Sequence, residues 1–294
     1  MRVFVTGATG WVGSYVVSEL KAAGYEVAGL ARTEEKADGL RIKGVEPVLG
    51  SLDDLQVIHG ATLRADAVIH LAFNREFAKF VENVVQDRLA IEAIGNALRG
   101  TEKLLLVTSG FVQIARGHLV TESDQPPADS LASRQSEQTV RTLAERGTRV
   151  STIRLSLSVH GIGESHGFVP ILIELARKTG VSAYVGDGQN RSPAVHVTDA
   201  ARLYRLALER RSVERVFHAV AEEGVSFRDI AETIGFKLGL PVEPREPEHF
   251  GWFGEIASVN VPASSSRTRA CLGWVPTGPT LLEDIASPAY FNGT

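Results

Sequence analysis

The stretch TGATGWVG, residues 6–13, follows a short apolar run and precedes an amphipathic one. A tight turn at this point needs glycine, because a side chain at Gly7 would block positive φ angles. Gly10 leaves space beside the backbone for a pyrophosphate, and Gly13 allows the following helix to pack on the preceding strand. The N–H groups at the start of that helix then face the phosphate charge. In this place the pattern predicts a dinucleotide-binding loop, and a plain glycine turn is the alternative.

Short apolar runs alternate with longer amphipathic runs through the first half of the chain. The apolar runs are rich in valine, isoleucine and leucine, which is typical of strands covered on both faces. We expect strands at residues 2–6, 25–31, 45–49, 66–72, 103–108 and 149–155. We expect helices at residues 11–23, 80–98 and 130–146. This alternation predicts an α/β fold with a Rossmann-type doubly wound parallel sheet.

The rhythm changes after about residue 156, where glycine and proline interrupt the pattern. Two helices stand out, one beginning at Thr198–Asp199 and one beginning with the capping box Ser226-x-x-Asp229. We therefore expect an NADP-binding Rossmann domain over residues 1–160, to which residues 194–222 return. Residues 161–294 should form mainly a smaller C-terminal substrate-binding lobe.

The composition narrows the function classes. The chain has 294 residues, 44% hydrophobic and 22% charged, with a net charge of −4. This charge provides no positive field that would attract nucleic acid or an acidic membrane. Cys271 is the only cysteine, so neither an intrachain disulfide nor a thiolate metal cluster can form. We expect a cytoplasmic protein with a small-molecule substrate and no membrane segment, and leave a homodimer open.

The residue after the second expected strand indicates which cofactor binds. An NAD site would have an acidic residue about 20 residues past the loop, to hold the ribose 2′-hydroxyl. Ala31 and Arg32 stand there instead. A guanidinium pairs with a 2′-phosphate, which favours NADP(H), and Lys36 can add charge at the same phosphate. The alternative is a surface arginine that pairs with Glu34 or Glu35.

Five further motifs follow the glycine loop along the sequence. They are DAVIHLAF (66–73), LLLVTSG (104–110), RLSLSVHG (154–161), GDGQNRSPAVHVTDAA (186–201) and LGWVPT (272–277). With TGATGWVG, they make the chain resemble the short-chain dehydrogenase/reductase superfamily. The likeness is to its extended and atypical branches, which include NAD(P)-dependent epimerase/dehydratase-like proteins. It covers nearly the whole chain.

The resemblance implies roles for individual residues. The pyrophosphate would be wrapped by Gly7, Thr9, Gly10, Trp11 and Val12. Arg32 would bind the 2′-phosphate, and the ribose side would be lined by Leu71, Ala72 and Phe73. Ser51 and Leu52 stand where the family usually places an aspartate and a leucine against adenine, so the aspartate is missing. Ser109 falls on the family's catalytic serine.

The chain departs from the family at the proton donor, which is a tyrosine with a lysine four residues later. Aligning Glu137 with the glutamate that often follows this motif puts Asp129 and Ser133 at the two positions. No tyrosine of this chain has a lysine four residues on: Tyr15, Tyr25, Tyr184, Tyr204, Tyr290. We interpret the polar helix around residues 128–140 as one that borders a cofactor cleft but has lost the acid. An exposed helix with a solvated face is the alternative.

Other residues are candidates for substrate chemistry. Ser109 can hydrogen-bond a substrate carbonyl, or simply cap a turn. His160 and His166 are candidate general acids near neutral pH, although a lone histidine is more often structural. Candidate substrate contacts are Arg191, His196 and Tyr184, with Asn190 beside them. For Tyr184 and the aromatic group 249–253, core packing is the favoured interpretation, and a salt bridge is the alternative for Arg191. No metal-ligand spacing occurs.

The favoured function is an NADP(H)-dependent oxidoreductase, a reductase or dehydrogenase for a small organic carbonyl that works without the usual Tyr–Lys pair. One alternative is a non-catalytic NADP-binding sensor or regulator, which the missing pair favours. A second is a sugar-nucleotide epimerase or dehydratase, which the missing tyrosine disfavours.

Overall fold

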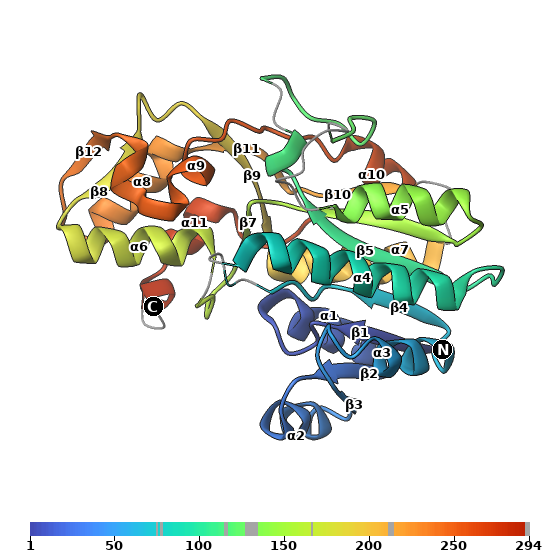
Figure 1. Ribbon diagram of the computed structural model, residues 1–294. Helices are drawn as coiled ribbons and strands as arrows, with labels where there is room; N and C mark the ends of the chain where they lie inside the picture. Colours follow the sequence, from blue (N-terminus) through green and yellow to red (C-terminus); the bar gives the residue numbers. More distant parts are fainter. Residues whose placement is uncertain are drawn as a thin grey trace. The chain divides into compact units, whose positions relative to one another are not determined.

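The computed structural model describes residues 1–74, 76, 79–114, 117–126, 135–165, 167–210 and 215–291. The chain forms two compact units, each built from three stretches of sequence (Figure 1). The first unit comprises Met1–Ser109, Pro126–Arg154 and Ala201–Phe217. The second unit comprises Gly110–Gln125, Leu155–Ala200 and His218–Thr294.

The first unit contains the central sheet. Its strands are β1 (Arg2–Thr6), β2 (Glu26–Ala31), β3 (Glu46–Leu49), β4 (Ala67–His70), β5 (Leu104–Gly110), β6 (Val150–Leu155) and β10 (Val216–Ala219). Their order is β10-β6-β5-β4-β1-β2-β3. β1 pairs in parallel with β2 and with β4, and the pairs β2–β3 and β4–β5 are also parallel. The strand order therefore reverses between β1 and β4, which is where open α/β sheets bind ligands.

Helices flank this sheet: α1 (Trp11–Ala22), α2 (Glu34–Ile42), α3 (Leu55–Leu63), α4 (Phe80–Leu98), α5 (Ser136–Glu145) and α7 (Val197–Arg210). Apolar side chains of the strands and helices meet in a buried core that includes Phe4, Val68, Ile91 and Leu105. Such strands are apolar on both faces because helices cover both faces. The expected doubly wound fold is confirmed.

The second unit has two smaller sheets. One has the order β11-β9-β7, with β7 (Ser158–His160), β9 (Arg191–His196) and β11 (Glu222–Ser226). The other pairs β8 (Ser182–Val185) with β12 (Val242–Arg245). Its helices are α6 (Phe168–Thr179), α8 (Phe227–Leu238), α9 (Gly254–Ala257), α10 (Ser266–Leu272) and α11 (Leu281–Ala286). Short 3₁₀ turns lie at η2 (Val112–Ile114), η3 (Pro247–Phe253) and η4 (Pro288–Phe291).

Aromatic side chains fill the core of the second unit. Phe168 lies edge-on to Phe227 and to Phe253, and Phe250 packs against Phe227. Phe250 and Phe253 are buried, whereas Trp252 is 55% exposed. Most of the aromatic group at 249–253 therefore packs the unit, in line with the favoured interpretation. Among the described residues, no helix is long and apolar enough to cross a bilayer.

Candidate functional site

The glycine loop joins β1 to α1 in the first unit. Gly7 has a φ of +71°, and its carbonyl oxygen accepts a hydrogen bond from the Gly10 N–H at 3.0 Å. Gly10 is the N-cap residue of α1, and no side chain caps this helix. The first N–H groups of a helix have no partner within it. The start of α1 therefore has the form of an anion-binding site.

The three glycines of the loop differ in what surrounds them. A Cβ on Gly13 would lie 2.0 Å from the Gly7 oxygen, and one on Gly7 would lie 2.7 Å from the Ala72 nitrogen. A Cβ on Gly10 would meet only the Gly7 oxygen, at 3.3 Å. Gly7 and Gly13 are thus required by close backbone packing. Gly10 has space beside it, which is where a pyrophosphate would fit.

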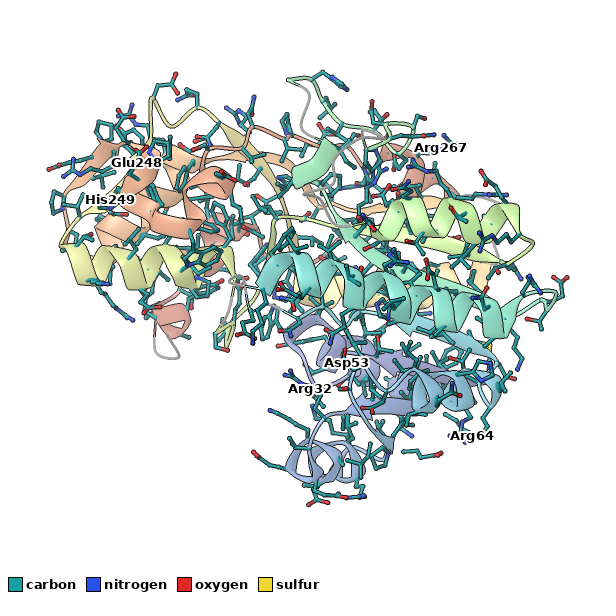
Figure 2. All side chains as sticks on the ribbon, in the orientation of Figure 1. Arg32, Asp53, Arg64, Glu248, His249 and Arg267 are labelled. Atoms are coloured by element: carbon teal, nitrogen blue, oxygen red, sulfur yellow. The ribbon has the colours of Figure 1, made fainter. Side chains whose placement is uncertain are left out.

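Arg32 lies at the carboxyl end of β2, directly before Thr33, the N-cap residue of α2 (Figure 2). The Thr33 hydroxyl accepts a hydrogen bond from the Lys36 N–H. Glu34, a suggested partner of Arg32, instead pairs with Arg41 at 3.3 Å. Across the part of the chain that the structure describes, Arg32 forms no ion pair. Its guanidinium is therefore available to a ligand anion.

Ser51, an expected adenine contact, takes part in a local turn. Its N–H and its hydroxyl donate to the Asp54 carboxylate at 2.7 and 2.8 Å, and these bonds hold the pKa of Asp54 below its ordinary value. The Ser51 oxygen also accepts from the Asp53 N–H. Leu52 is buried beside it. Ser51 thus takes part in the turn that shapes the loop after β3, and its role as an adenine contact stays a prediction.

Leu71, Ala72 and Phe73 follow β4, which ends at His70 and not at Ala72 as expected. The Leu71 N–H still donates to the Thr6 carbonyl, and the Ala72 N–H donates to the Thr6 hydroxyl at 3.3 Å. Because a Cβ on Gly7 would lie 2.7 Å from the Ala72 nitrogen, this segment lies close to the glycine loop. The structure therefore brings two of the expected cofactor-binding segments together.

A series of hydrogen-bonded, buried polar side chains starts at Thr6, beside the glycine loop. It was not predicted from the sequence. The Thr6 hydroxyl lies 2.9 Å from His70 Nδ1, and His70 Nε2 lies 3.1 Å from Asp87 Oδ1. The Ser136 hydroxyl donates to Asp87 Oδ2 at 2.6 Å. All four side chains are at most 1% exposed. His70 occurs in the motif DAVIHLAF, but only the fold shows its partners.

Ser109 lies near the carboxyl end of β5 and is buried. The hydroxyl of the preceding Thr108 shares a 2.7 Å hydrogen bond with Tyr204, which explains why Tyr204 is held in the interior. No described residue hydrogen-bonds the Ser109 hydroxyl. Glu137 forms a buried bidentate pair with Arg154. The aligned positions Asp129 and Ser133, like His166, lie outside the described residues.

His160 sits in a polar cluster of the second unit. Its ring is fully buried, and Nδ1 lies 2.6 Å from Asp284. Nε2 is 3.9 Å from Glu222 and has no hydrogen-bond partner among the described residues. Burial raises the pKa of Glu222, an effect that the Leu281 N–H partly offsets. His196 stacks edge-on against His160, and burial lowers its pKa. The cluster brings both imidazoles close to Asp284, and His160 also lies near Glu222.

The remaining expected substrate contacts also lie in the second unit. Arg191 donates from Nη1 to the Gly224 carbonyl at 3.0 Å, and its N–H donates to Asn260. The Asn190 amide donates to the Ala257 carbonyl and so anchors the loop. Tyr184 is buried, with the Arg228 guanidinium 5.4 Å from its ring centre. These contacts bind the segments of the unit to one another.

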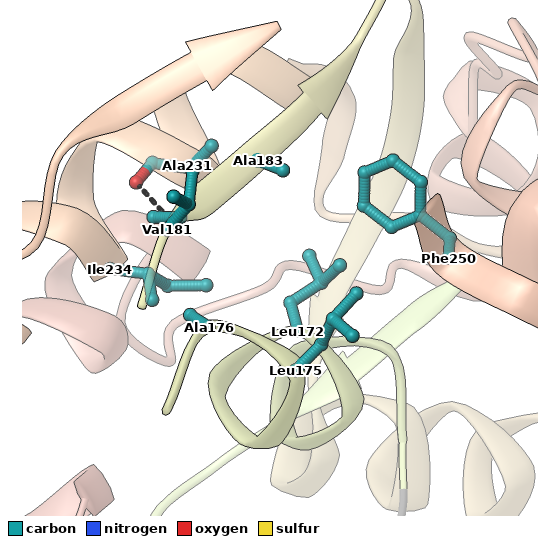
Figure 3. Close-up of a pocket in the computed structure, with 9 residues that line it drawn as sticks. Leu172, Leu175, Ala176, Val181, Ala183, Ala231, Ile234 and Phe250 are labelled. Carbon is teal, nitrogen blue, oxygen red and sulfur yellow. Dashed lines mark hydrogen bonds between the residues drawn. The ribbon is translucent and has the colours of Figure 1, made fainter. Parts of the chain in front are cut away.

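A narrow apolar gap, without space for a water molecule, lies between α6, β8 and α8 (Figure 3). Leucine, alanine, valine and isoleucine side chains and Phe250 line it, and the Ser182 hydroxyl donates to the Ala231 carbonyl at its wall. Its lining offers no set of converging polar groups that would orient a substrate. We regard it as part of the core.

Known proteins resemble the chain along its whole length. The model of the NAD dependent epimerase/dehydratase family matches residues 3–220. An uncharacterized protein of Schizosaccharomyces pombe is 46% identical over 296 residues, covering 99% of this chain and 100% of that protein. A decarboxylating sterol-4-alpha-carboxylate 3-dehydrogenase of Dictyostelium discoideum is 28% identical, covering 77% of this chain and 73% of that protein.

Solved structures share the fold. The UDP-glucose 4-epimerase of Thermus thermophilus, in complex with NAD, superposes with a TM-score of 0.76 at 23% identity. The match covers 100% of this chain and 99% of that one. With the family match over residues 3–220, these comparisons show that the chain belongs to the NAD dependent epimerase/dehydratase family.

Proposed function

We propose that the protein is an NADP(H)-dependent oxidoreductase that acts on a small organic carbonyl compound or the corresponding alcohol. The observation that carries this proposal is an open glycine loop together with an arginine at the end of β2 that forms no ion pair with the described residues. The family uses nicotinamide cofactors, and the relative in Dictyostelium is named as a dehydrogenase.

The residues of the first unit fit the cofactor. The pyrophosphate would bind at the start of α1, beside Gly10 and the N–H groups of Trp11 and Val12. Arg32 would take the 2′-phosphate, with Lys36 nearby in sequence. Bound there, the cofactor would supply the hydride. The segment Leu71–Phe73 would then line the ribose side. Ser51 and Leu52 would lie on the adenine side.

Ser109 is the residue proposed to hold the substrate oxygen. Reduction of a carbonyl leaves negative charge on oxygen, and a donor positioned at that oxygen stabilises it. The Ser109 hydroxyl suits this task because the described residues make no other use of it. A serine is a poor acid, so the proton must come from water or an imidazole. We therefore expect slow turnover or substrates whose product anion is already stable.

The test is a panel of aldehydes, ketones and quinones with NADPH, followed by Ser109→Ala on the best substrate. We expect a loss in kcat of about 10²–10³-fold, which is typical for removal of one such donor. Ser18→Ala, which removes an exposed serine hydroxyl from α1, is the control and should leave the rate unchanged. Undiminished activity in Ser109→Ala would remove Ser109 from the mechanism.

A non-catalytic NADP-binding sensor is the second candidate, because no tyrosine has a lysine four residues on. Tight NADPH binding without oxidation of NADPH by any compound of the panel would favour it. The sugar-nucleotide epimerases among the structural neighbours share the fold, and a UDP-sugar belongs in the panel as a direct check on that reaction.

A further inference from the structure

Four buried polar side chains of the first unit, here called the hydrogen-bond chain, come from four elements. The hydrogen-bond chain runs from Thr6 at the end of β1, through His70 at the end of β4 and Asp87 on α4, to Ser136 at the start of α5. Buried polar groups destabilise a fold unless they are hydrogen-bonded, and here each side chain has a partner at 2.6–3.1 Å. At one end of the hydrogen-bond chain, the Thr6 hydroxyl accepts from the Ala72 N–H. The hydrogen-bond chain therefore connects a cofactor-side segment to the first turn of α5.

The directions of the hydrogen bonds can be assigned from the donors and acceptors. An ionised Asp87 only accepts, so Ser136 donates its hydroxyl proton and His70 must donate from Nε2. A neutral imidazole then has a bare Nδ1, which accepts from the Thr6 hydroxyl. The Thr6 oxygen is in turn free to accept from the Ala72 N–H. From Ala72 to Asp87 every hydrogen bond is thus donated toward the carboxylate, which also accepts from Ser136.

We propose that this chain is a positioning device for the cofactor site, in which Asp87 fixes the tautomer of His70 and His70 fixes Thr6 and the Leu71–Phe73 segment. The proposal rests on the proposed function, since that segment is assigned there to the ribose side. The position matters because Ala72 leaves no space for even a Cβ on Gly7, which would lie 2.7 Å from the Ala72 nitrogen. A shift of Ala72 either presses on the glycine loop or withdraws from it.

The first experiment observes the imidazole directly, in the cofactor-free protein. The nitrogen resonances of His70 are recorded in protein labelled with ¹⁵N-histidine, and are identified among the eight histidines by their loss in His70→Gln. We expect a protonated Nε2 and a bare Nδ1 at neutral pH. A protonated Nδ1, alone or together with Nε2, would overturn the proposed direction of the chain.

The second experiment tests positioning. Thr6→Val keeps the shape of the side chain but removes both the donor to His70 and the acceptor for Ala72. We expect NADPH affinity to fall about 10-fold, and Thr6→Ser to restore it. Thr62→Val is the matched control, because Thr62 is a fully buried threonine whose hydroxyl donates to Ile58 within α3. It should lower the melting temperature without changing the affinity.

The outcomes separate the two proposals. Unchanged NADPH affinity in folded Thr6→Val would show that the chain is only structural, and would overturn the positioning role. If Thr6→Val does not fold, Ser136→Ala removes the opposite end, and a loss of about 3-fold in affinity is expected. An unchanged affinity there would likewise contradict the proposal. If the unaltered protein binds neither NADPH nor NADH, the proposed function fails, whereas the His70 resonances still decide the hydrogen-bond direction.

Discussion

At the scale of single residues, Arg32 is the side chain that we expect to set the choice between NADPH and NADH. Arg32→Ala should weaken NADPH binding by about 1.5–3 kcal/mol, because hydrogen bonds to a charged phosphate are lost, and should leave NADH binding unchanged. The control is Arg41→Ala, which removes an arginine of the neighbouring α2 that already pairs with Glu34. Calorimetric titration of both cofactors gives the answer. Equal affinities for NADPH and NADH in the unaltered protein would contradict the assignment of Arg32.

The glycines of the loop should separate folding from binding. Gly10→Val places a side chain where the pyrophosphate would lie but meets only one backbone atom, at 3.3 Å. We expect a folded protein without cofactor affinity. Gly13→Val should fail to fold, because its Cβ would lie 2.0 Å from the Gly7 oxygen. Circular dichroism and calorimetry report the two properties. NADPH binding at native affinity in Gly10→Val would mean that the phosphate lies elsewhere.

The raised pKa of Glu222 predicts a pH-dependent stability. Burial is its largest cause, and the charges of Glu283 and Asp284 add to it. Below 4.5, the ordinary value, the carboxyl is protonated in both the folded and unfolded states. As the pH rises from there through the folded-state pKa, the folded state binds more protons, so the free energy of unfolding falls.

Glu222→Gln stays neutral and should escape this loss. Its free energy of unfolding, measured in urea, should rise relative to the unaltered protein between pH 4.5 and neutrality. Asp54→Asn provides the control, because bonds from Ser51 lower the pKa of that carboxyl, so the stability it contributes is lost as the pH falls and changes mainly below pH 4.5. A difference between Glu222→Gln and the unaltered protein that is constant with pH would refute the prediction.

At the scale of elements, a buried ion pair ties α5 to β6. Arg154 and Glu137 are almost fully buried and share hydrogen bonds of 2.8 and 2.7 Å. Arg154→Met leaves a buried carboxylate without its partner and should lower the free energy of unfolding by about 3–5 kcal/mol. Replacing Glu137 by Leu in the same chain should recover much of this loss. Urea denaturation measures all three proteins.

The comparison pair lies on the surface of the same unit. Arg205 and Glu19 are 23% and 29% exposed, so Arg205→Met should cost no more than about 1 kcal/mol. If Arg154→Met and Arg205→Met lowered the free energy of unfolding by similar amounts, burial would not make the loss of an ion-pair partner more destabilising.

Elements with strong periodicity could be predicted from the sequence, and contacts between distant elements could not. The helix expected at residues 80–98 has those bounds in the structure, and Ser226 caps α8 as the motif indicated. The strand expected to reach Ala72 ends at His70, where its pairing with β1 and β5 ends. Apolar runs do not reveal where a strand stops pairing.

The missed features join residues far apart in the sequence. Thr6 and His70 are 64 residues apart, and His160 and Asp284 are 124 apart. No spacing rule links such pairs, because only the order of the strands and helices brings them together. The local turn at Ser51 could have been predicted from the sequence, because serine three residues before aspartate is a turn-forming pattern.

At the scale of the whole molecule, neither unit is a continuous piece of sequence. The first unit uses residues up to Ser109, then Pro126–Arg154, then Ala201–Phe217. An expression fragment that ended at residue 160 would therefore lack α7 and the sheet strand β10. Such a fragment would retain the glycine loop, but β6 would lack its neighbour β10.

The same chain path has a consequence for biosynthesis. A ribosome makes β1 and the glycine loop first, yet the outermost strand β10 is not made until residues 216–219. At about 5–20 residues per second, several seconds pass between completion of β6 at Leu155 and the arrival of that strand. During this interval the nascent sheet presents the backbone of β6 as an open edge, which is the kind of surface that pairs with other chains. We therefore expect the translation interval between β6 and β10 to be the stage at which this edge is most open to pairing with other chains.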